Sequence, residues 1–428
     1  MSGVADPSSQ TDDEIHVRHL DCGMVVLISP MPWLRTAAVS IAVRGGAIYE
    51  TGGSGDAESK AGLAGLVSEM ISRGAGPHSS RDLVAVQDDL GIDQGGGAST
   101  ITSSIGSSMP AESLVAAIEL NAHILRRPHL PIDQLEDAKE MAMQELRAYR
   151  DEPTHRVMKR LREMTYGDPL GRSVQGTDEG IAAIIADDVR DFYTEHYHAG
   201  RSIVGVAGNV DPDDVFDALA TQFGDWKQLD VPELPSPSGR VGYEHIEMPS
   251  SQTHIGFSFD CVPYGHEDYF AMRAGIGILS DGMSSRLFDR VREQRGLCYT
   301  ISASVNNLPH AAAVFGYAGT TPARAQETLD VTRHEILSLP EGLTQAELDR
   351  WKVRIESGLI MEQESSSSRA ESLIADWHQL GRVQTTGELQ QIIQNLTLER
   401  VRDYWTQNPL AVTRVVTLGQ EPLDFDSE

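Results

Sequence analysis

A chain of 428 residues is too long for one ordinary domain, so we expect two to four domains with an ample hydrophobic core. The composition, 40% hydrophobic and 23% charged, is ordinary for a globular protein. The formal net charge of −28 argues against nucleic acid or an anionic membrane as the main partner, because both need a basic face. A strongly acidic surface favours solubility, or alternatively a basic partner or substrate.

The cysteines and the amino-terminal segment bear on the compartment. Cys22, Cys261 and Cys298 are far apart, which is neither a disulfide framework nor a zinc site and is typical of a reducing compartment. Residues 1–14 are polar and acidic and lack the basic start and apolar stretch of a signal peptide. No apolar run is long enough to span a bilayer. We therefore expect a cytoplasmic protein without a membrane partner.

Strands alternate irregularly with long helices along the chain. Residues 37–43 are apolar and predict a strand. Residues 131–167 predict a long amphipathic helix, interrupted at 151–153 because proline breaks a helix, and then a second helix. Residues 344–363 predict another helix, and the serines at 365–368 predict a surface loop or a helix cap. This order favours α+β layers, with helices packed on mainly antiparallel sheets.

A duplication is the clearest feature of the whole sequence. Residues 189–193 (Val-Arg-Asp-Phe-Tyr) recur at 401–405 (Val-Arg-Asp-Tyr-Trp), about 212 residues later. A β-branched run follows each copy, at 201–206 and at 413–418. A helix end, a short loop and a strand thus occur twice, which predicts two similar halves rather than a solenoid.

The boundary between these halves is predicted from composition. Residues 230–239 have the proline and serine density of an extended linker. We therefore expect an amino-terminal half over 1–227, a linker over 228–242 and a carboxy-terminal half over 243–428. The fold class is α+β, with two homologous halves that fold towards each other as a clamshell.

Four sequence blocks, at 61–74, 140–153, 167–177 and 284–299, resemble the pitrilysin/insulinase metallopeptidases, the inverted zincins. Their order and spacing match the short two-subunit branch of that family, which includes the mitochondrial processing peptidases. The resemblance covers nearly the whole chain. It implies two halves of related structure, and a zinc-binding helix within the first block.

The positions that bind zinc in this family differ in this chain. Where the family has His-x-x-Glu-His, the sequence reads Gly-Leu-Val-Ser-Glu, which places Gly65 and Glu69 at the histidines and Ser68 at the general base. Glu145 matches the family's distal glutamate ligand. Catalytic zinc needs about three protein ligands, and Gly65 has no donor atom. A Glu69–Glu145 pair suits hard cations better than zinc. We expect the chain alone to hold no metal and to be inactive.

The second half keeps residues that the resemblance implicates in substrate binding. Family members of this branch use an arginine and a tyrosine seven positions apart, and Arg292 and Tyr299 match them. An arginine can hold a substrate carbonyl, and a tyrosine hydroxyl can donate to an oxyanion. The glycine-rich stretch 95–97 falls at the strand to which active members add the substrate, although it is equally a glycine-eased turn into an ordinary strand.

Other motifs carry less. His196 and His198 have the spacing of a metal pair, but we interpret them as a satisfied pair on the surface. His334-Glu335 begins like a His-Glu-x-x-His helix, but its fifth position is Ser338. No Walker A sequence, Rossmann fingerprint or Gly-x-Ser-x-Gly elbow occurs.

These observations lead to one main hypothesis and two alternatives. The main hypothesis is a substrate-binding, regulatory subunit of a heterodimeric zinc peptidase. Its partners are a His-x-x-Glu-His subunit, which holds the zinc, and a peptide substrate. One alternative is a scaffold or core subunit of a larger, non-proteolytic assembly. The other is a peptidase with an atypical metal site around Glu69 and Glu145.

Overall fold

The computed structural model describes residues 14–50, 60–230, 232–409 and 411–425. The strands of the first half are β1 (His16–His19), β2 (Val25–Pro30), β3 (Thr36–Val43), β4 (Asp93–Ala98), β5 (Ser103–Pro110) and β6 (Ile203–Gly208). Its helices are α1 (Leu63–Met70), α2 (Ser80–Leu90), α3 (Leu114–Arg126), α4 (Leu135–Asp151), α5 (Pro153–Tyr166), α6 (Asp178–Ala183), α7 (Ala186–His196) and α8 (Pro212–Phe223).

The second half repeats this pattern. Its strands are β7 (Gly242–Glu247), β8 (Thr253–Cys261), β9 (Cys298–Leu308), β10 (Ala311–Thr320) and β11 (Arg414–Gly419). Its helices are α9 (Tyr269–Ser280), a π-helix η5 (Leu287–Glu293), α10 (Ala325–Leu337), α11 (Gln345–Glu362), α12 (Ser366–Leu380), α13 (Thr386–Asn395) and α14 (Leu398–Gln407).

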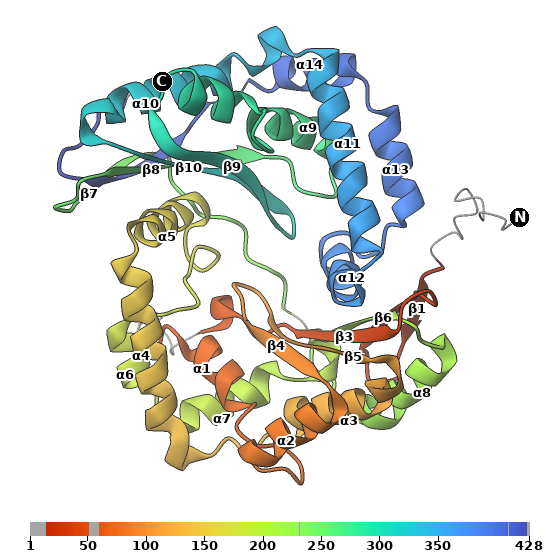
Figure 1. Ribbon diagram of the computed structural model, residues 1–428. Helices are drawn as coiled ribbons and strands as arrows, with labels where there is room; N and C mark the ends of the chain where they lie inside the picture. The colour runs from red at the N-terminus through yellow and green to blue at the C-terminus, as the bar shows by residue number, and fades with distance from the viewer. Residues whose placement is uncertain (1–13, 51–59, 231, 410, 426–428) are drawn as a thin grey trace, which may run out of the picture.

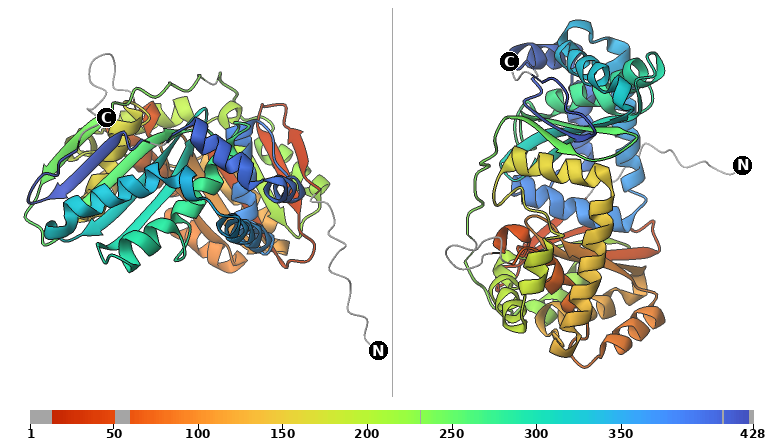
Figure 2. Two further views of the ribbon diagram at one scale, coloured as in Figure 1. Left: turned by 90° about the horizontal axis from the view of Figure 1, so that it is seen from above. Right: turned by 90° about the vertical axis from the view of Figure 1, so that its left-hand side faces the viewer.

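Each half is built on one sheet, and the two sheets have equivalent strand orders. The first sheet runs β1-β2-β6-β3-β5-β4 and the second β7-β11-β8-β10-β9. The only parallel pairs in them are β2–β6 and β7–β11 among the described strands, so both sheets are mainly antiparallel. The predicted α+β class with two homologous halves is confirmed, and the sheets face each other as a clamshell (Figures 1 and 2).

The duplicated sequence lies at equivalent places in the two halves. Residues 189–193 fall in α7 and residues 401–405 in α14, and each helix leads into a central strand, β6 or β11. Helices α4 and α5 meet at Glu152, because Pro153 is the first residue of α5 and cannot donate to a preceding turn. Ser365 caps α12 by accepting from the Ser368 backbone, so the serine run begins a helix.

Each half contributes one helix that packs on the sheet of the other half. Helix α5 packs on β8 and β11 of the second sheet, and α12 packs on β3 and β6 of the first sheet. In Figure 2 both helices lie between the sheets. Glycines permit this close approach: a Cβ at Gly205 of β6 would lie 2.1 Å from the Ala370 carbonyl oxygen of α12. A Cβ at Gly256 of β8 would lie 2.5 Å from Val157 Cγ1 of α5.

The segment between the halves has no regular structure over its described residues. Residues 226–230 and 232–241 form neither helix nor strand, and β7 begins at Gly242. The division at 228–242 stays a prediction as a domain boundary, because α5 and α12 each belong to one half in sequence and pack on the other. Within the described ranges, every helix is too short or too polar to cross a membrane.

Candidate functional site

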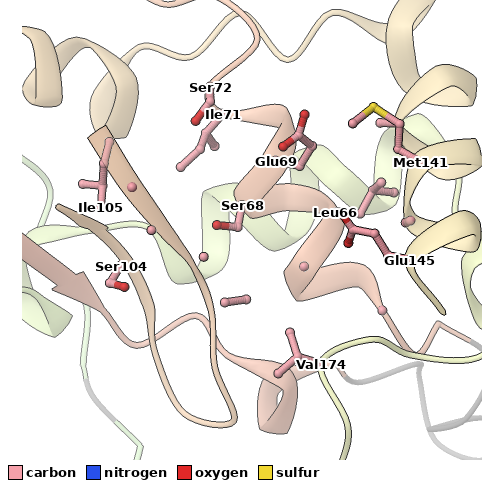
Figure 3. A pocket seen from close by; sticks show the side chains of 18 of the residues that line it. Leu66, Ser68, Glu69, Ile71, Ser72, Ser104, Ile105, Met141, Glu145 and Val174 are labelled. Atoms are coloured by element: carbon pink, nitrogen blue, oxygen red, sulfur yellow. The ribbon is translucent and has the colours of Figure 1, made fainter. Parts of the chain in front are cut away.

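A cavity of about 490 Å³ lies where the sequence predicts the site (Figure 3). Its walls are α1 on one side, the edge strand β4 opposite, α4 behind them and the residues after α5 at one end. Three of the predicted residues on α1 and one on α4 line it together, so the structure brings all four into one place: Gly65, Ser68, Glu69 and Glu145.

Helix α1 is held at its amino end by a side chain that the sequence did not single out. Gly62, at φ 106°, is its N-cap and offers no side chain. The buried carboxylate of Glu50 instead accepts from the backbone N–H groups of Gly62 (3.2 Å) and Ala64 (2.9 Å). These groups are orphan donors of the first turn and favour a negative charge. No periodicity or local capping pattern connects Glu50 with this helix.

Burial raises the pKa of Glu50 from its ordinary 4.5 to about 7, against the two backbone hydrogen bonds and the charge of Arg172. The folded protein therefore retains a proton that the unfolded chain releases, and stability falls as pH rises through this interval. We expect Glu50→Gln to flatten the pH dependence of urea unfolding between about pH 5 and about pH 7. The control is Glu69→Gln, an exposed carboxylate on α1 itself. An unchanged slope in Glu50→Gln would show that another group titrates.

The place of the first family histidine is partly filled by the opposite wall. A Cβ built on Gly65 would lie 3.3 Å from the Val174 carbonyl oxygen and 3.7 Å from Val174 Cγ1. The first distance is closer than most real Cβ contacts, so a side chain here requires a small shift of the neighbouring loop. In Figure 3, Val174 lies at the end of the cavity below α1.

Ser68 is engaged with a buried tyrosine. Tyr197 donates from its hydroxyl to Ser103 Oγ at 2.8 Å, and a hydrogen bond with Ser68 also acts on it. Burial raises the pKa of Tyr197 to about 12, against these two hydrogen bonds, so its hydroxyl keeps its proton at neutral pH. Ser68 therefore takes part in a network of neutral hydroxyl groups.

The two carboxylates of the cavity come from different helices. Glu69 accepts from Arg73 Nε at 3.1 Å, one helical turn away on the same chain segment. Arg73 is largely buried and also contacts the Gln134 carbonyl and Met141 Sδ. Glu145 is exposed on α4. A guanidinium thus lies beside the position of the second family histidine and opposes a metal cation there.

These side chains do not fit a catalytic zinc ion. Gly65 supplies no donor, Ser68 is a neutral hydroxyl, and Glu69 already pairs with Arg73. Across the described ranges no three His, Cys, Asp or Glu side chains converge as a metal site would require. Two carboxylates without imidazole also suit hard cations better than zinc.

Strand β4 presents an open backbone edge to this cavity. Among the described strands it pairs with β5 alone, and its glycines line the cavity. A Cβ at Gly95 or Gly97 would meet no described heavy atom within 4 Å, whereas one at Gly96 would lie 2.2 Å from the Ser104 carbonyl oxygen. Unpaired N–H and C=O groups with free space beside them can accept an added strand.

Arg292 and Tyr299 lie in the second half and do not line the cavity of α1. Arg292 lies at the end of the π-helix η5, with its guanidinium 4.4 Å from the centre of the Phe288 ring. Tyr299 is near the start of β9, the edge strand of the second sheet, and is 63% exposed. Elements η5 and β9 pack against each other, so both side chains belong to one region of the surface.

The histidines at the end of α7 are not a surface pair, as the sequence suggested. His196 is 4% exposed and His198 1% exposed. The ring of His196 lies 4.4 Å from that of Phe192 and 5.1 Å from that of Tyr49. The expectation that they lie on the surface is wrong, because the chain turns inward after α7 to enter the central strand β6.

Two family models and several known proteins match this chain. A model of the family described as Insulinase (Peptidase family M16) matches residues 25–178, and a model described as Peptidase M16 inactive domain matches residues 183–354. A Rickettsia felis protein named as an uncharacterized zinc protease is 23% identical over 96% of this chain and 99% of its own length. A Bacillus subtilis protein with the same description, YmxG, is 23% identical over 89% of this chain and 92% of its own length.

Two solved structures share the fold. A structure described as a peptidase M16 inactive domain from Pseudomonas fluorescens has a TM-score of 0.80 and 21% identity, and covers 97% of this chain and 100% of its own. A protease from Helicobacter pylori has a TM-score of 0.83 and 19% identity, and covers 96% and 100%. With family models matched in both halves, this chain belongs to the insulinase (M16) family of peptidases.

Proposed function

We propose that this chain is a non-catalytic, substrate-binding subunit of a heterodimeric zinc peptidase, with a degenerate site of its own. The observation that carries the proposal is the cavity of α1. Helix α1, the edge strand β4 and Glu145 line it together, and Gly65, Ser68 and Glu69 stand at the positions that the resemblance assigns to zinc binding. The zinc and the general base are then supplied by a partner subunit with an intact His-x-x-Glu-His helix.

The edge strand β4 supports a role in holding peptides. An extended peptide that adds to β4 forms backbone hydrogen bonds without regard to sequence, and the open faces of Gly95 and Gly97 leave room for it. The charged residues that line the cavity are both carboxylates, Glu69 and Glu145, among the described residues. Together with the net charge of −28, they favour peptides that carry basic side chains.

The exposed pair on the second half supports the two-subunit arrangement. Arg292 and Tyr299 do not line the cavity of α1, and Tyr299 is 63% exposed, which supports a role for the pair towards a substrate bound on another subunit. There a guanidinium can hold a substrate carbonyl through several donors, and a phenol can donate to the oxyanion that forms at the scissile carbonyl.

Co-expression with a His-x-x-Glu-His partner tests the proposal. The chain alone is expected to contain no stoichiometric zinc and to cleave no peptide, and the pair is expected to be active. Arg292→Ala in this chain should lower the kcat/KM of the pair by about 100-fold, as for removal of one transition-state donor. Peptide cleavage by purified pairs is the measurement.

Arg295→Ala is the matched control, because Arg295 is exposed in the same segment and outside the Arg–Tyr pair. Full activity in Arg292→Ala would contradict the proposed role of Arg292 and Tyr299 in substrate binding. Copurification with a large assembly that contains no His-x-x-Glu-His chain would instead favour the scaffold function. Stoichiometric metal in the chain alone would favour an atypical metal site at Glu69 and Glu145.

A further inference from the structure

A second cavity, of about 500 Å³, lies at the junction of the two halves. Its floor is the start of the parallel strands β2 and β6, and the carboxyl end of α12 and the turn between β9 and β10 cover it. Figure 1 shows the β9–β10 hairpin reaching towards α12 and the first sheet. Volumes of this size are typical of small-molecule sites.

The polar lining of this junction cavity consists of Arg44, two histidines, Ser202 and Gln379. Arg44 at the end of β3, His310 in the β9–β10 turn and His378 on α12 are its titratable side chains, and among the described lining residues there is no Asp or Glu. An anion can therefore enter it without meeting a carboxylate from the described wall.

His310 is held in a conformation that a histidine rarely adopts. Its φ of 66° is in the left-handed region that favours glycine, and it stands at the tip of the hairpin. A glycine or asparagine would satisfy such a turn at lower cost. Strained residues of this kind gather at ligand sites, and here the strain places an imidazole at the mouth of the junction cavity.

His378 has an unused hydrogen-bonding atom. Its Nε2 is buried and has no hydrogen-bond partner in the described part of the chain. Burial, together with the nearby charge of Arg44, lowers the pKa of His378 to about 4. The imidazole is therefore neutral at physiological pH, and a neutral ring can donate from one nitrogen to a ligand oxygen. A buried polar atom without a partner requires a water molecule or a ligand.

One side of the cavity is apolar. Trp377 lines the cavity next to His378, and its ring meets that of His19 edge to face at 5.9 Å. Val25, Ile203 and Leu380 complete this side. Polar groups that converge beside an apolar and aromatic surface fix the orientation of a bound small molecule.

We propose that the junction cavity binds a small organic anion. Its carboxylate or phosphate group lies beside Arg44 and His378, and its apolar part packs on Trp377. Residues of both halves line the cavity, so such a ligand stabilises the clamshell arrangement in addition to occupying a pocket. The site is separate from the cavity of α1 and does not depend on the proposed peptidase function.

Titration of the purified chain with inorganic phosphate and, separately, with benzoate tests this proposal. Sodium chloride at equal ionic strength is the reference in both arms. Saturable quenching of tryptophan fluorescence and a rise in Tm are expected with one of the two probes. A response to phosphate indicates a phosphate-type ligand, and a response to benzoate indicates a carboxylate-type ligand. Trp377→Phe should abolish the quenching, which assigns the signal to the junction cavity.

Arg44→Gln and His378→Gln should each weaken the apparent affinity by about tenfold or more, the loss expected for one hydrogen bond to a charged group. Arg382→Gln is the matched control, since Arg382 is exposed, pairs with Glu388 and does not line the cavity. The competing explanation is that Arg44 serves only to offset the carboxyl end of α12. In that case Arg44→Gln lowers stability, neither probe gives a saturable response in the unmodified chain, and the proposal is overturned.

Discussion

Replacement of Gly205 by valine is expected to lower the free energy of unfolding by about 2–3 kcal/mol, the cost of overpacking a closely packed contact. The Cβ of the new residue would lie 2.1 Å from the Ala370 carbonyl oxygen and 3.1 Å from its carbonyl carbon. These are backbone atoms of α12, so no side-chain rotation relieves the clash and the whole helix must move away from β6. Urea unfolding followed by far-UV circular dichroism measures the loss.

The loss of stability should depend on whether the new Cβ meets a neighbouring atom. Two other glycines test this. Gly256→Ala brings a Cβ to 2.5 Å from Val157 Cγ1, a buried β-branched side chain in a helix with little freedom to rotate, so a loss of stability is expected here too. Gly358→Ala lies in α11 where a Cβ meets no described atom within 4 Å. It should leave stability unchanged or raise it by about 0.5–1 kcal/mol, because glycine is a poor helix former. Equal losses in Gly205→Val and Gly358→Ala would contradict a role for α12 packing.

The two halves could be predicted because the duplication leaves a trace in local sequence. Residues 189–193 and 401–405 each lie within a helix that precedes a central strand, and the same helix and strand occur in both halves. The break at Pro153 was equally predictable, since proline acts through its own ring and missing N–H. Features of this kind depend on neighbours in sequence.

The exchange of α5 and α12 could not be predicted in the same way. An amphipathic helix indicates that one of its faces is buried, without indicating which sheet buries it. The small residues Gly205 and Gly256 within strands signal close approach of another backbone or side chain, but the partner lies more than ninety positions away in each case. Only the folded arrangement assigns α12 to β6 and α5 to β8.

The four residues that the resemblance named lie together, whereas the residues around them could not be predicted from the sequence. The resemblance placed Gly65, Ser68, Glu69 and Glu145, and all four line one cavity. The groups that decide its chemistry lie elsewhere in the sequence: Glu50 caps α1, Tyr197 engages Ser68, and Val174 approaches Gly65. Each is a buried contact between distant segments, and no spacing rule reveals such contacts.

Restoration of the three family residues in α1 is expected to create a zinc site. In the triple variant Gly65→His, Ser68→Glu, Glu69→His, positions 65 and 69 lie one turn apart on the same helix face, and Glu145 on α4 supplies the third ligand. The unmodified chain should contain no stoichiometric zinc, and the triple variant about one ion per chain. Metal analysis of dialysed protein and competition with a chromophoric chelator measure both.

The same contacts that now occupy the site limit the affinity of this variant. A side chain at position 65 must displace the Val174 carbonyl oxygen, 3.3 Å from the new Cβ, by a few tenths of an ångström. Replacement of Glu69 also leaves Arg73 without its carboxylate, so its charge opposes the metal ion. Adding Arg73→Gln to the triple variant should therefore tighten zinc binding.

Glu145→Gln in the triple variant is the decisive control. Loss of a direct ligand should weaken zinc binding by at least the roughly 10–100-fold that loss of a supporting hydrogen bond costs. If affinity is unchanged, Glu145 is not the retained ligand and its correspondence to the family's distal glutamate is wrong. If the triple variant is folded by circular dichroism and binds no zinc, helix α1 and α4 no longer hold the spacing of a zinc site. This chain would then differ from a zinc-binding member in the placement of its backbone, in addition to the three side chains.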